Sequence, residues 1–144
     1  MTQKQKDLLL KDLCGRLSHG VKCAEVYPDG NKFENEWDII KISKYVEDGI
    51  HISNCKTIYG YCSSIENIKP YLFPLSSMTE EQLYNNPVGF SQMLTIKADR
   101  DWENITINRR SYYKLVDWFN KNHFDYRGLI PMGLAIDATG LNIY

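Results

Sequence analysis

Apolar residues at helical spacing mark the amino-terminal part of the chain. Residues 2–19 carry leucines at intervals of three and four, which predicts a helix. We expect Thr2 to cap its start, because a hydroxyl accepts a hydrogen bond from an otherwise unpaired amide, and Gly20 to end it in a left-handed conformation. The apolar stripe is Leu9, Leu10, Leu13, Cys14 and Leu17, with Lys4, Lys11 and Asp12 mainly on the other side.

The strongest helical pattern lies near the other end and covers residues 109–122. Asn108 or Ser111 can cap its start. Because its apolar positions recur at three, four and seven residues, one face of this helix should pack on a sheet. Those positions are Tyr112, Leu115, Val116 and Phe119.

Between these helices, short runs of alternating residues separated by turn signals predict strands. Residues 28–31, Pro-Asp-Gly-Asn, form the clearest turn. The alternation slips at Ile39-Ile40, which indicates a bulge or a strand covered on both faces. Strands joined this closely are most simply arranged as an antiparallel meander. The expected strands are residues 21–27, 37–43 and 50–52, with residues 54–63 as a fourth strand or a loop.

The middle of the chain is less regular. Residues 65–72 have helical spacing, but Pro70 limits that helix to a short piece. Residues 91–107 are ambiguous, with residues 105–107 as a candidate edge strand. Two capping boxes can start a short helix between these stretches, Ser77 with Glu80 or Thr79 with Gln82.

These elements predict an α+β fold in one domain, residues 1–144. We expect an antiparallel sheet of about three to five strands, with an amino-terminal helix and a long carboxy-terminal helix packed on it. A chain of 144 residues fits one domain.

Charge and hydropathy narrow the classes of function. The chain has 17 basic and 18 acidic residues, a formal net charge of -1, whereas a dedicated nucleic-acid binder usually has a basic excess. Nucleic acid is therefore not the favoured partner, although a net charge near zero is compatible with a local basic patch. No apolar run reaches the roughly 18 residues of a membrane span, and the amino terminus lacks a signal-peptide pattern. We expect a cytoplasmic protein without a membrane partner.

The cysteines lack the spacing of a zinc site. The four are Cys14, Cys23, Cys55 and Cys62, and no pair is two residues apart as in a zinc knuckle. The nearest metal-like group, His51 with Cys55 and Cys62, lacks a fourth ligand. We expect four free, mostly buried thiols and no metal or other cofactor.

The densest polar group is the segment His123-Phe124-Asp125-Tyr126-Arg127. A histidine beside a carboxylate can act as a general base, and an arginine can hold an anion. The structural interpretation is that His123 is a cation at a helix carboxyl end, that Asp125 caps the amides of Arg127 and Gly128, and that Arg127 pairs with Asp125 or Asp117. We expect a structural corner first, a binding surface second and no catalytic residue.

Two other groups carry candidate chemistry. The acidic pairs Asp99/Asp101 and Glu34/Glu36 could hold a divalent cation, but solvated carboxylates are the simpler interpretation. A basic-aromatic stretch that could bind nucleic acid consists of Arg109, Arg110, Tyr112, Tyr113 and Lys114. Because Tyr112 fits the apolar stripe, we favour a core role for that face.

Three ordered segments resemble a group of small proteins from phages and prophages of Bacteroides and related gut bacteria. They are residues 10–17 (LKDLCGRL) with 20–22, residues 68–72 (IKPYL) with 74–81 (PLSSMTEE), and residues 117–120 (DWFN) with 123–130 (HFDYRGLI). The resemblance spans nearly the whole chain and implies a mobile-element protein, without implying an activity.

The preferred hypothesis is therefore a non-enzymatic accessory protein that binds a phage or host protein. Near-zero net charge and ten tyrosines suit a protein interface, since tyrosine combines apolar area with a polar tip. The alternatives are a nucleic-acid-binding protein of a mobile element or, less favoured, a small hydrolase or nuclease. The candidate binding residues are His123, Asp125, Tyr126, Arg127, Arg109 and Arg110.

Overall fold

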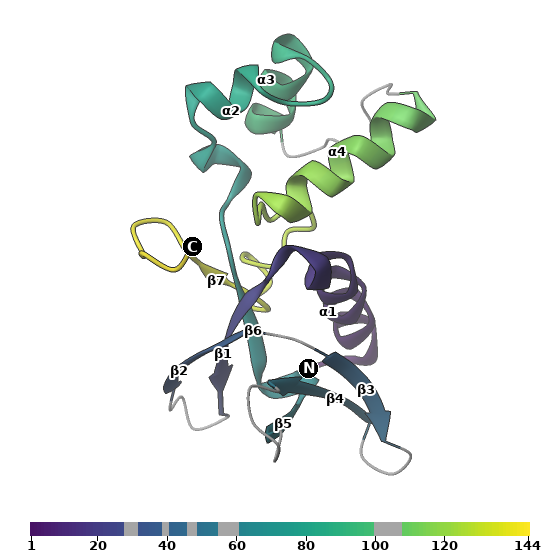
Figure 1. The fold of residues 1–144 in the computed structure, drawn as a ribbon, viewed down its shortest axis with the longest axis vertical. Helices are drawn as coiled ribbons and strands as arrows, with labels where there is room; N and C mark the ends of the chain where they lie inside the picture. Colours follow the sequence, from purple (N-terminus) through teal and green to yellow (C-terminus); the bar gives the residue numbers. More distant parts are fainter. Residues whose placement is uncertain (28–31, 39–40, 46–48, 55–60, 100–107) are drawn as a thin grey trace.

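The computed structural model describes residues 1–27, 32–38, 41–45, 49–54, 61–99 and 108–144, and has the predicted α+β fold (Figure 1). The helices are α1 (Gln3–Arg16), α2 (Glu80–Tyr84), α3 (Phe90–Asp99) and α4 (Arg109–Lys121). The strands are β1 (Lys22–Val26), β2 (Lys32–Asp38), β3 (Lys41–Tyr45), β4 (Gly49–Asn54), β5 (Tyr61–Ser64), β6 (Ile68–Leu72) and β7 (Ile136–Asp137). Short 3-10 turns cover Leu17–His19, Ile65–Asn67 and Leu75–Ser77.

Helix α1 begins where local chemistry predicts but ends at Arg16, and the 3-10 turn Leu17–His19 covers the rest of the predicted helix. The Thr2 hydroxyl accepts from the Gln5 amide, and the Gln5 side chain accepts from the Thr2 amide, so a complete capping box starts the helix. Gly20 follows the 3-10 turn with a φ of 69°, as expected for a left-handed stop. Two side chains differ from the prediction, because Asp12 is fully buried and Cys14 is exposed.

The first sheet has the strand order β2-β1-β6-β7. The pair β1–β2 is antiparallel as predicted. The antiparallel pair β1–β6 and the parallel pair β6–β7 were not predicted, and they make this sheet mixed. The prediction of a short helix over residues 65–72 was wrong, since a 3-10 turn and then β6 occupy this stretch. In β6 the buried residues Ile68, Pro70 and Leu72 alternate with half-buried ones, which is the period of a strand.

The second sheet has the order β3-β4-β5, with both pairs antiparallel. The single strand predicted over residues 37–43 was wrong, because β2 ends at Asp38 and β3 begins at Lys41 in the other sheet. Residues 39–40, where the alternation slips, lie outside the described residues, as does the predicted turn at 28–31.

Helices α2, α3 and α4 lie together at the end of the molecule away from the sheets (Figure 1). Of the two predicted capping boxes, the one formed by Thr79 and Gln82 starts α2. Asn108 caps α4 by accepting from the Ser111 amide at 2.9 Å. Helix α3 covers residues 91–99 of the ambiguous stretch, and the candidate strand at 105–107 lies outside the described residues.

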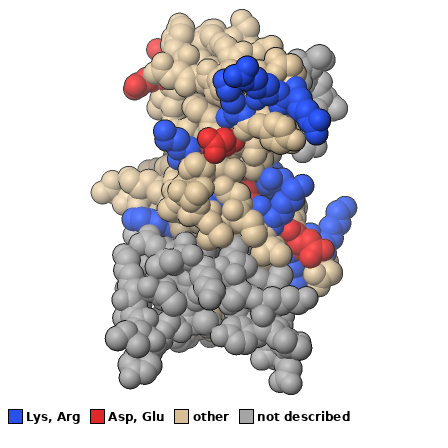
Figure 2. Space-filling model, turned by 45° about the vertical axis from the view of Figure 1, so that its right-hand side comes forward, with Lys and Arg blue, Asp and Glu red and all other residues tan. Residues whose placement is uncertain are grey.

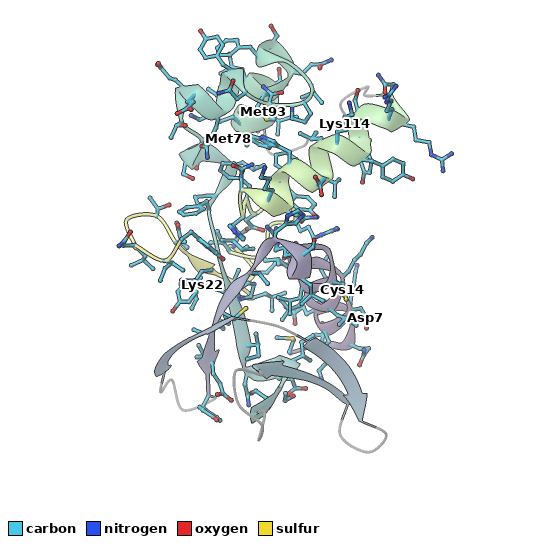
Figure 3. All side chains as sticks on the ribbon, viewed as in Figure 1. Asp7, Cys14, Lys22, Met78, Met93 and Lys114 are labelled. Carbon is cyan, nitrogen blue, oxygen red and sulfur yellow. The ribbon has the colours of Figure 1, made fainter. Side chains whose placement is uncertain are left out.

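Helix α4 packs on other helices rather than on the sheet, which corrects the predicted arrangement. It has 13 residues and is not long. Leu115 and Phe119 are fully buried among side chains of α2 and α3, and Met78 and Met93 lie in the same region (Figure 3). Tyr112 is exposed, so only part of the predicted stripe is core.

Among the side chains that the structure describes, the buried apolar ones form two clusters. The lower cluster joins α1 to the first sheet and contains Leu9, Leu13, Val21, Cys23, Ile65, Ile68, Leu72, Leu129, Leu134 and Ala135. The upper cluster contains Leu75, Met78, Leu83, Met93, Ile96, Leu115, Phe119, Phe124 and Tyr126. In the part of the chain that the structure describes, no helix combines the length and the apolar character needed to cross a membrane.

Candidate functional site

A buried ion pair on α1 lies beside the corner formed by residues 123–133. Asp12 and Arg16, one helical turn apart, are both fully buried. Arg16 Nε donates to Asp12 Oδ2 at 2.7 Å, and Arg16 Nη2 donates to Asp12 Oδ1 at 3.0 Å and to the Phe124 carbonyl at 2.8 Å. The pair therefore ties α1 to the start of the corner.

Arg127 adds a second cation to this pair. Its Nε lies 3.3 Å from Asp12 Oδ1, so the predicted partners, Asp125 and Asp117, were wrong. The Arg127 guanidinium also lies over the Tyr126 ring, 4.7 Å from its centroid. A planar cation against an aromatic face is held in a fixed orientation. The side chain of Arg127 remains 18% exposed, whereas Asp12 is completely enclosed.

Tyr126 is the centre of the corner. Its hydroxyl donates to Asn120 Oδ1 at 3.0 Å, and its ring stacks on Phe119 with centroids 5.2 Å apart. The Arg16 guanidinium carbon lies 5.4 Å from the same ring centroid. Asn120 approaches α1 at Gly15, where a β-carbon would lie 3.0 Å from Asn120 Nδ2. Glycine at position 15 thus permits the close contact of α1 and α4.

Asp125 organises the turn that follows. Its two carboxylate oxygens accept from the amides of Leu129 and Ile130, each at 2.8 Å. The sequence predicted a cap at this residue but placed it on Arg127 and Gly128, which was wrong because the turn is longer. Burial raises the pKa of Asp125, while the two backbone hydrogen bonds oppose that shift.

Replacing Asp125 with alanine should lower the free energy of unfolding by about 0.5–2 kcal/mol, the range for a lost cap. Asp125→Asn should cost less, because its amide oxygen can still accept from one of the two backbone amides. Urea unfolding of both variants measures the difference. Equal stability of Asp125→Ala and the parent would show that the cap does not hold the corner.

His123 begins the corner, and its ring contacts Tyr144 near the carboxyl end of the chain. It has a φ of 56°, its side chain is 7% exposed, and its ring stacks on Tyr144 with centroids 3.7 Å apart. Its Nδ1 has no hydrogen-bond partner among the residues that the structure describes. Burial, with smaller contributions from the charges of Arg16 and His19, lowers the pKa of His123 to about 4. The prediction of a cation at the helix end was therefore wrong, since His123 is neutral at pH 7.

Because His123 is buried in its neutral state, we expect it to make the folded protein less stable at acid pH. Because the pKa in the folded protein is below the ordinary value, this stabilising contribution is complete above about pH 6.5 and is lost as the pH falls toward 4. His123→Asn keeps a residue that tolerates positive φ. Its urea midpoint should fall less than the parent's between about pH 7 and about pH 4.5. An imidazole that titrates near its ordinary pKa by NMR would contradict this assignment.

A concave site, called here the corner cleft, opens beside Asp125 and Arg127. Its volume is about 540 Å³. Two backbone hydrogen bonds join the corner to Phe73, the residue that follows β6. Phe73 N donates to the His123 carbonyl at 2.9 Å, and Asp125 N donates to the Phe73 carbonyl at 2.7 Å. The lining residues are Pro74, Leu75, Ser76, Asp125, Tyr126, Arg127, Gly128, Ile130, Pro131 and Asp137. Three of the four predicted corner residues line the cleft, and His123 does not.

The basic-aromatic stretch lies apart from the cleft, at the start of α4. Arg109, Arg110 and Lys114 are exposed, and Figure 2 shows Lys and Arg side chains gathered over this end of the molecule. Tyr112 is 41% exposed and Tyr113 is 60% exposed. The core role expected of Tyr112 was wrong, because its ring and that of Tyr113 are exposed, whereas Leu115 and Phe119 of the same predicted stripe are buried.

The remaining candidates are only partly described. Cys14 and Cys23 are free, and burial raises the pKa of the Cys23 thiol well above its usual value. The side chains of His51, Cys55 and Cys62, and of the acidic pairs Glu34/Glu36 and Asp99/Asp101, lie outside the described residues. Among the side chains that are described, no three His, Cys, Asp or Glu residues form a group that could hold a metal ion.

Comparison of the chain with protein-family models, with curated proteins and with solved structures found no match. The cleft, the buried charges and the exposed faces are therefore the features from which a function can be inferred.

Proposed function

We propose that this protein is a non-enzymatic accessory protein of a phage or prophage that acts in the host cytoplasm by binding another protein. The observation that carries the proposal is the corner cleft with Arg127 at its wall. The occupant is a segment of a phage or host protein that inserts an apolar side chain and presents an acidic group to Arg127.

The composition of the cleft supports a peptide segment as the occupant. Pro74, Leu75 and Ile130 supply apolar wall, whereas Arg127 and Asp137 supply opposite charges. Both oxygens of Asp125 already accept backbone hydrogen bonds, and Asp137 Oδ1 accepts from the Thr139 amide at 2.9 Å. A few polar groups among apolar ones are typical of sites that fix the orientation of a ligand.

Arg127 is held in position before any partner arrives. Its Nε lies within ion-pair distance of Asp12, which also pairs with Arg16, and its guanidinium lies over the Tyr126 ring. A side chain that is already ordered loses little conformational entropy on binding, which favours affinity. An arginine fork that is partly exposed suits a carboxylate of the partner.

The geometry supports binding better than acid–base catalysis at this corner. A catalytic pair of His123 and Asp125 would need the histidine to face the carboxylate within hydrogen-bond reach. Here the imidazole stacks on Tyr144 and its Nδ1 has no partner, while the carboxylate is occupied by the amides of Leu129 and Ile130. The hydrolase alternative therefore has no specific observation in its favour.

The experiment compares two tryptophan variants by affinity purification from phage-carrying host cells. Ser76 is exposed in a 3-10 turn at the cleft, so Ser76→Trp should obstruct the cleft. Ser18 is exposed in another 3-10 turn and does not line the cleft, which makes Ser18→Trp the matched control. We expect a partner recovered with the parent and the control to fall about tenfold or more with Ser76→Trp.

Thermal melts of both variants establish that they fold. Equal recovery of every protein with Ser76→Trp and Ser18→Trp would overturn the cleft as the binding site. Purification of the parent chain alone, across several growth states, would overturn protein binding itself.

A further inference from the structure

The first two turns of α4 present cations and an aromatic ring on one face. Arg109 and Arg110 occupy the first two helical positions, and Tyr113 follows them by four and three residues. Side chains at these spacings are neighbours on a helix surface. Tyr113 is 60% exposed, Lys114 is exposed beside it, and the Tyr112 ring meets the Tyr113 ring edge-on at 5.9 Å. This group of residues is called the α4 face.

The charge of this helix differs from that of the chain. Residues 109–121 contain four cations and one acid, a net charge of +3, so the rest of the chain carries -4 against the total of -1. The acid, Asp117, lies 3.2 Å from His19 Nε2 on the neighbouring 3-10 turn. Among the described residues, no ion pair neutralises Arg109, Arg110 or Lys114.

Fold stability does not account for these arginines. The amino-terminal end of a helix carries a partial positive charge, so acids are favoured there and cations are not. Helix α4 has no acid in its first turn and begins with two arginines. An anionic partner would offset this repulsion, and an exposed aromatic ring flanked by cations adds a surface for stacking.

We propose that the α4 face binds single-stranded nucleic acid. Arg109, Arg110 and Lys114 pair with successive phosphates, and a base stacks on Tyr113. Single strands fit better than a duplex, because a duplex buries the faces of its bases between neighbouring pairs. The exposed ring among the cations favours nucleic acid over an acidic protein segment, for which charge alone would suffice. No residue of α4 lines the corner cleft, so this surface is independent of the protein-binding proposal.

The test is a fluorescence-anisotropy titration of the full chain with labelled oligo-dT of about 12 nucleotides, a length suited to one small binding surface. A duplex of the same length and a poly-glutamate peptide of equal charge are the comparison probes. We expect the single strand to bind most tightly. Its affinity should fall as salt is raised from about 50 to about 200 mM, because phosphate contacts release counterions.

Two sets of variants measure separately how the charges of the α4 face and the stacking on Tyr113 contribute to the affinity for nucleic acid. Arg109→Ala with Arg110→Ala should weaken binding and reduce the slope of log affinity against log salt by about 1.4, since each phosphate that is no longer neutralised accounts for about 0.7. Tyr113→Ala should weaken binding about fivefold or more without changing that slope, because it removes a stacked base. The matched controls are Lys4→Ala with Lys11→Ala on exposed positions of α1, and Tyr84→Ala on α2, where the ring is 69% exposed.

Three results would overturn the proposal. The first is the absence of salt-sensitive binding to the single strand by the parent. The second is equal loss of affinity in the α4 variants and their controls. The third is equal binding of oligo-dT and poly-glutamate with no effect of Tyr113→Ala, which would assign the face to an acidic protein segment instead.

Discussion

Replacing Phe119 with alanine should lower the free energy of unfolding by about 3–5 kcal/mol, which is the cost of the lost apolar transfer plus the cavity left behind. The side chain is fully buried and contacts three aromatic rings. Its ring centroid lies 5.7 Å from Trp118, 6.5 Å from Phe124 and 5.2 Å from Tyr126. Urea unfolding of the parent and the variant measures the loss.

Tyr113→Ala is the matched control on the same helix. It also replaces an aromatic residue with alanine, but its ring is 60% exposed, so its effect should stay within about 0.5 kcal/mol. If Phe119→Ala unfolded at the same urea concentration as the control, α4 would not contribute to the core through this residue.

Removing the Asp12 carboxylate should be as damaging, for an electrostatic reason. Asp12→Ala leaves Arg16 fully buried and without its counter-ion, and it removes the anion beside Arg127. Breaking a buried pair from one side costs about 3–5 kcal/mol, because an uncompensated charge stays in the interior. We expect a loss of that size in urea unfolding, together with a less ordered Arg127.

A double variant shows whether the loss of stability comes from the unpaired charge of Arg16 or from lost packing. Asp12→Ala with Arg16→Met removes both charges and keeps most of the Arg16 volume, so its loss of stability should be smaller than the sum of the two single losses. The control is Glu66→Ala, which removes an exposed carboxylate paired with the half-buried Lys6 and should change the unfolding midpoint little. Strictly additive losses in the double variant would show that Asp12 and Arg16 do not act as a pair.

The helix caps and the helix stop were the features predicted most accurately from the sequence. Thr2 and Asn108 cap their helices, and Gly20 stops one, because each of these effects depends on residues within one helical turn. Residues 65–72 misled the prediction because Ile65, Ile68 and Leu72 match a helical period by coincidence. The burial of Ile68, Pro70 and Leu72 on one face of β6 depends on α1 and β1, which are distant in sequence.

Only one wall of the corner cleft was predicted from the sequence. The corner residues Asp125, Tyr126 and Arg127 were identified as a dense polar segment, and all three line the cleft. The opposite wall, residues 74–76, carries no unusual chemistry, and its position depends on how the chain leaves β6. The Asp12–Arg16 pair was missed because Asp12 was assigned to the solvent side of α1. Its signal was an acid and a base four residues apart within a leucine-rich helix, beside the apolar stripe.

The two apolar clusters also differ in how far apart their members lie along the chain. Every described member of the upper cluster falls within residues 73–126, whereas the lower cluster joins residues 8–23, 65–72 and 129–135. Contacts between residues close in sequence require the closure of shorter loops, so they form faster during folding. Chain entropy therefore favours condensation of the upper helices first. The lower cluster would follow once residues 65–72 and 129–135 meet α1. The contacts of Arg16 with the Phe124 carbonyl and of Arg127 with Asp12 would form at that step.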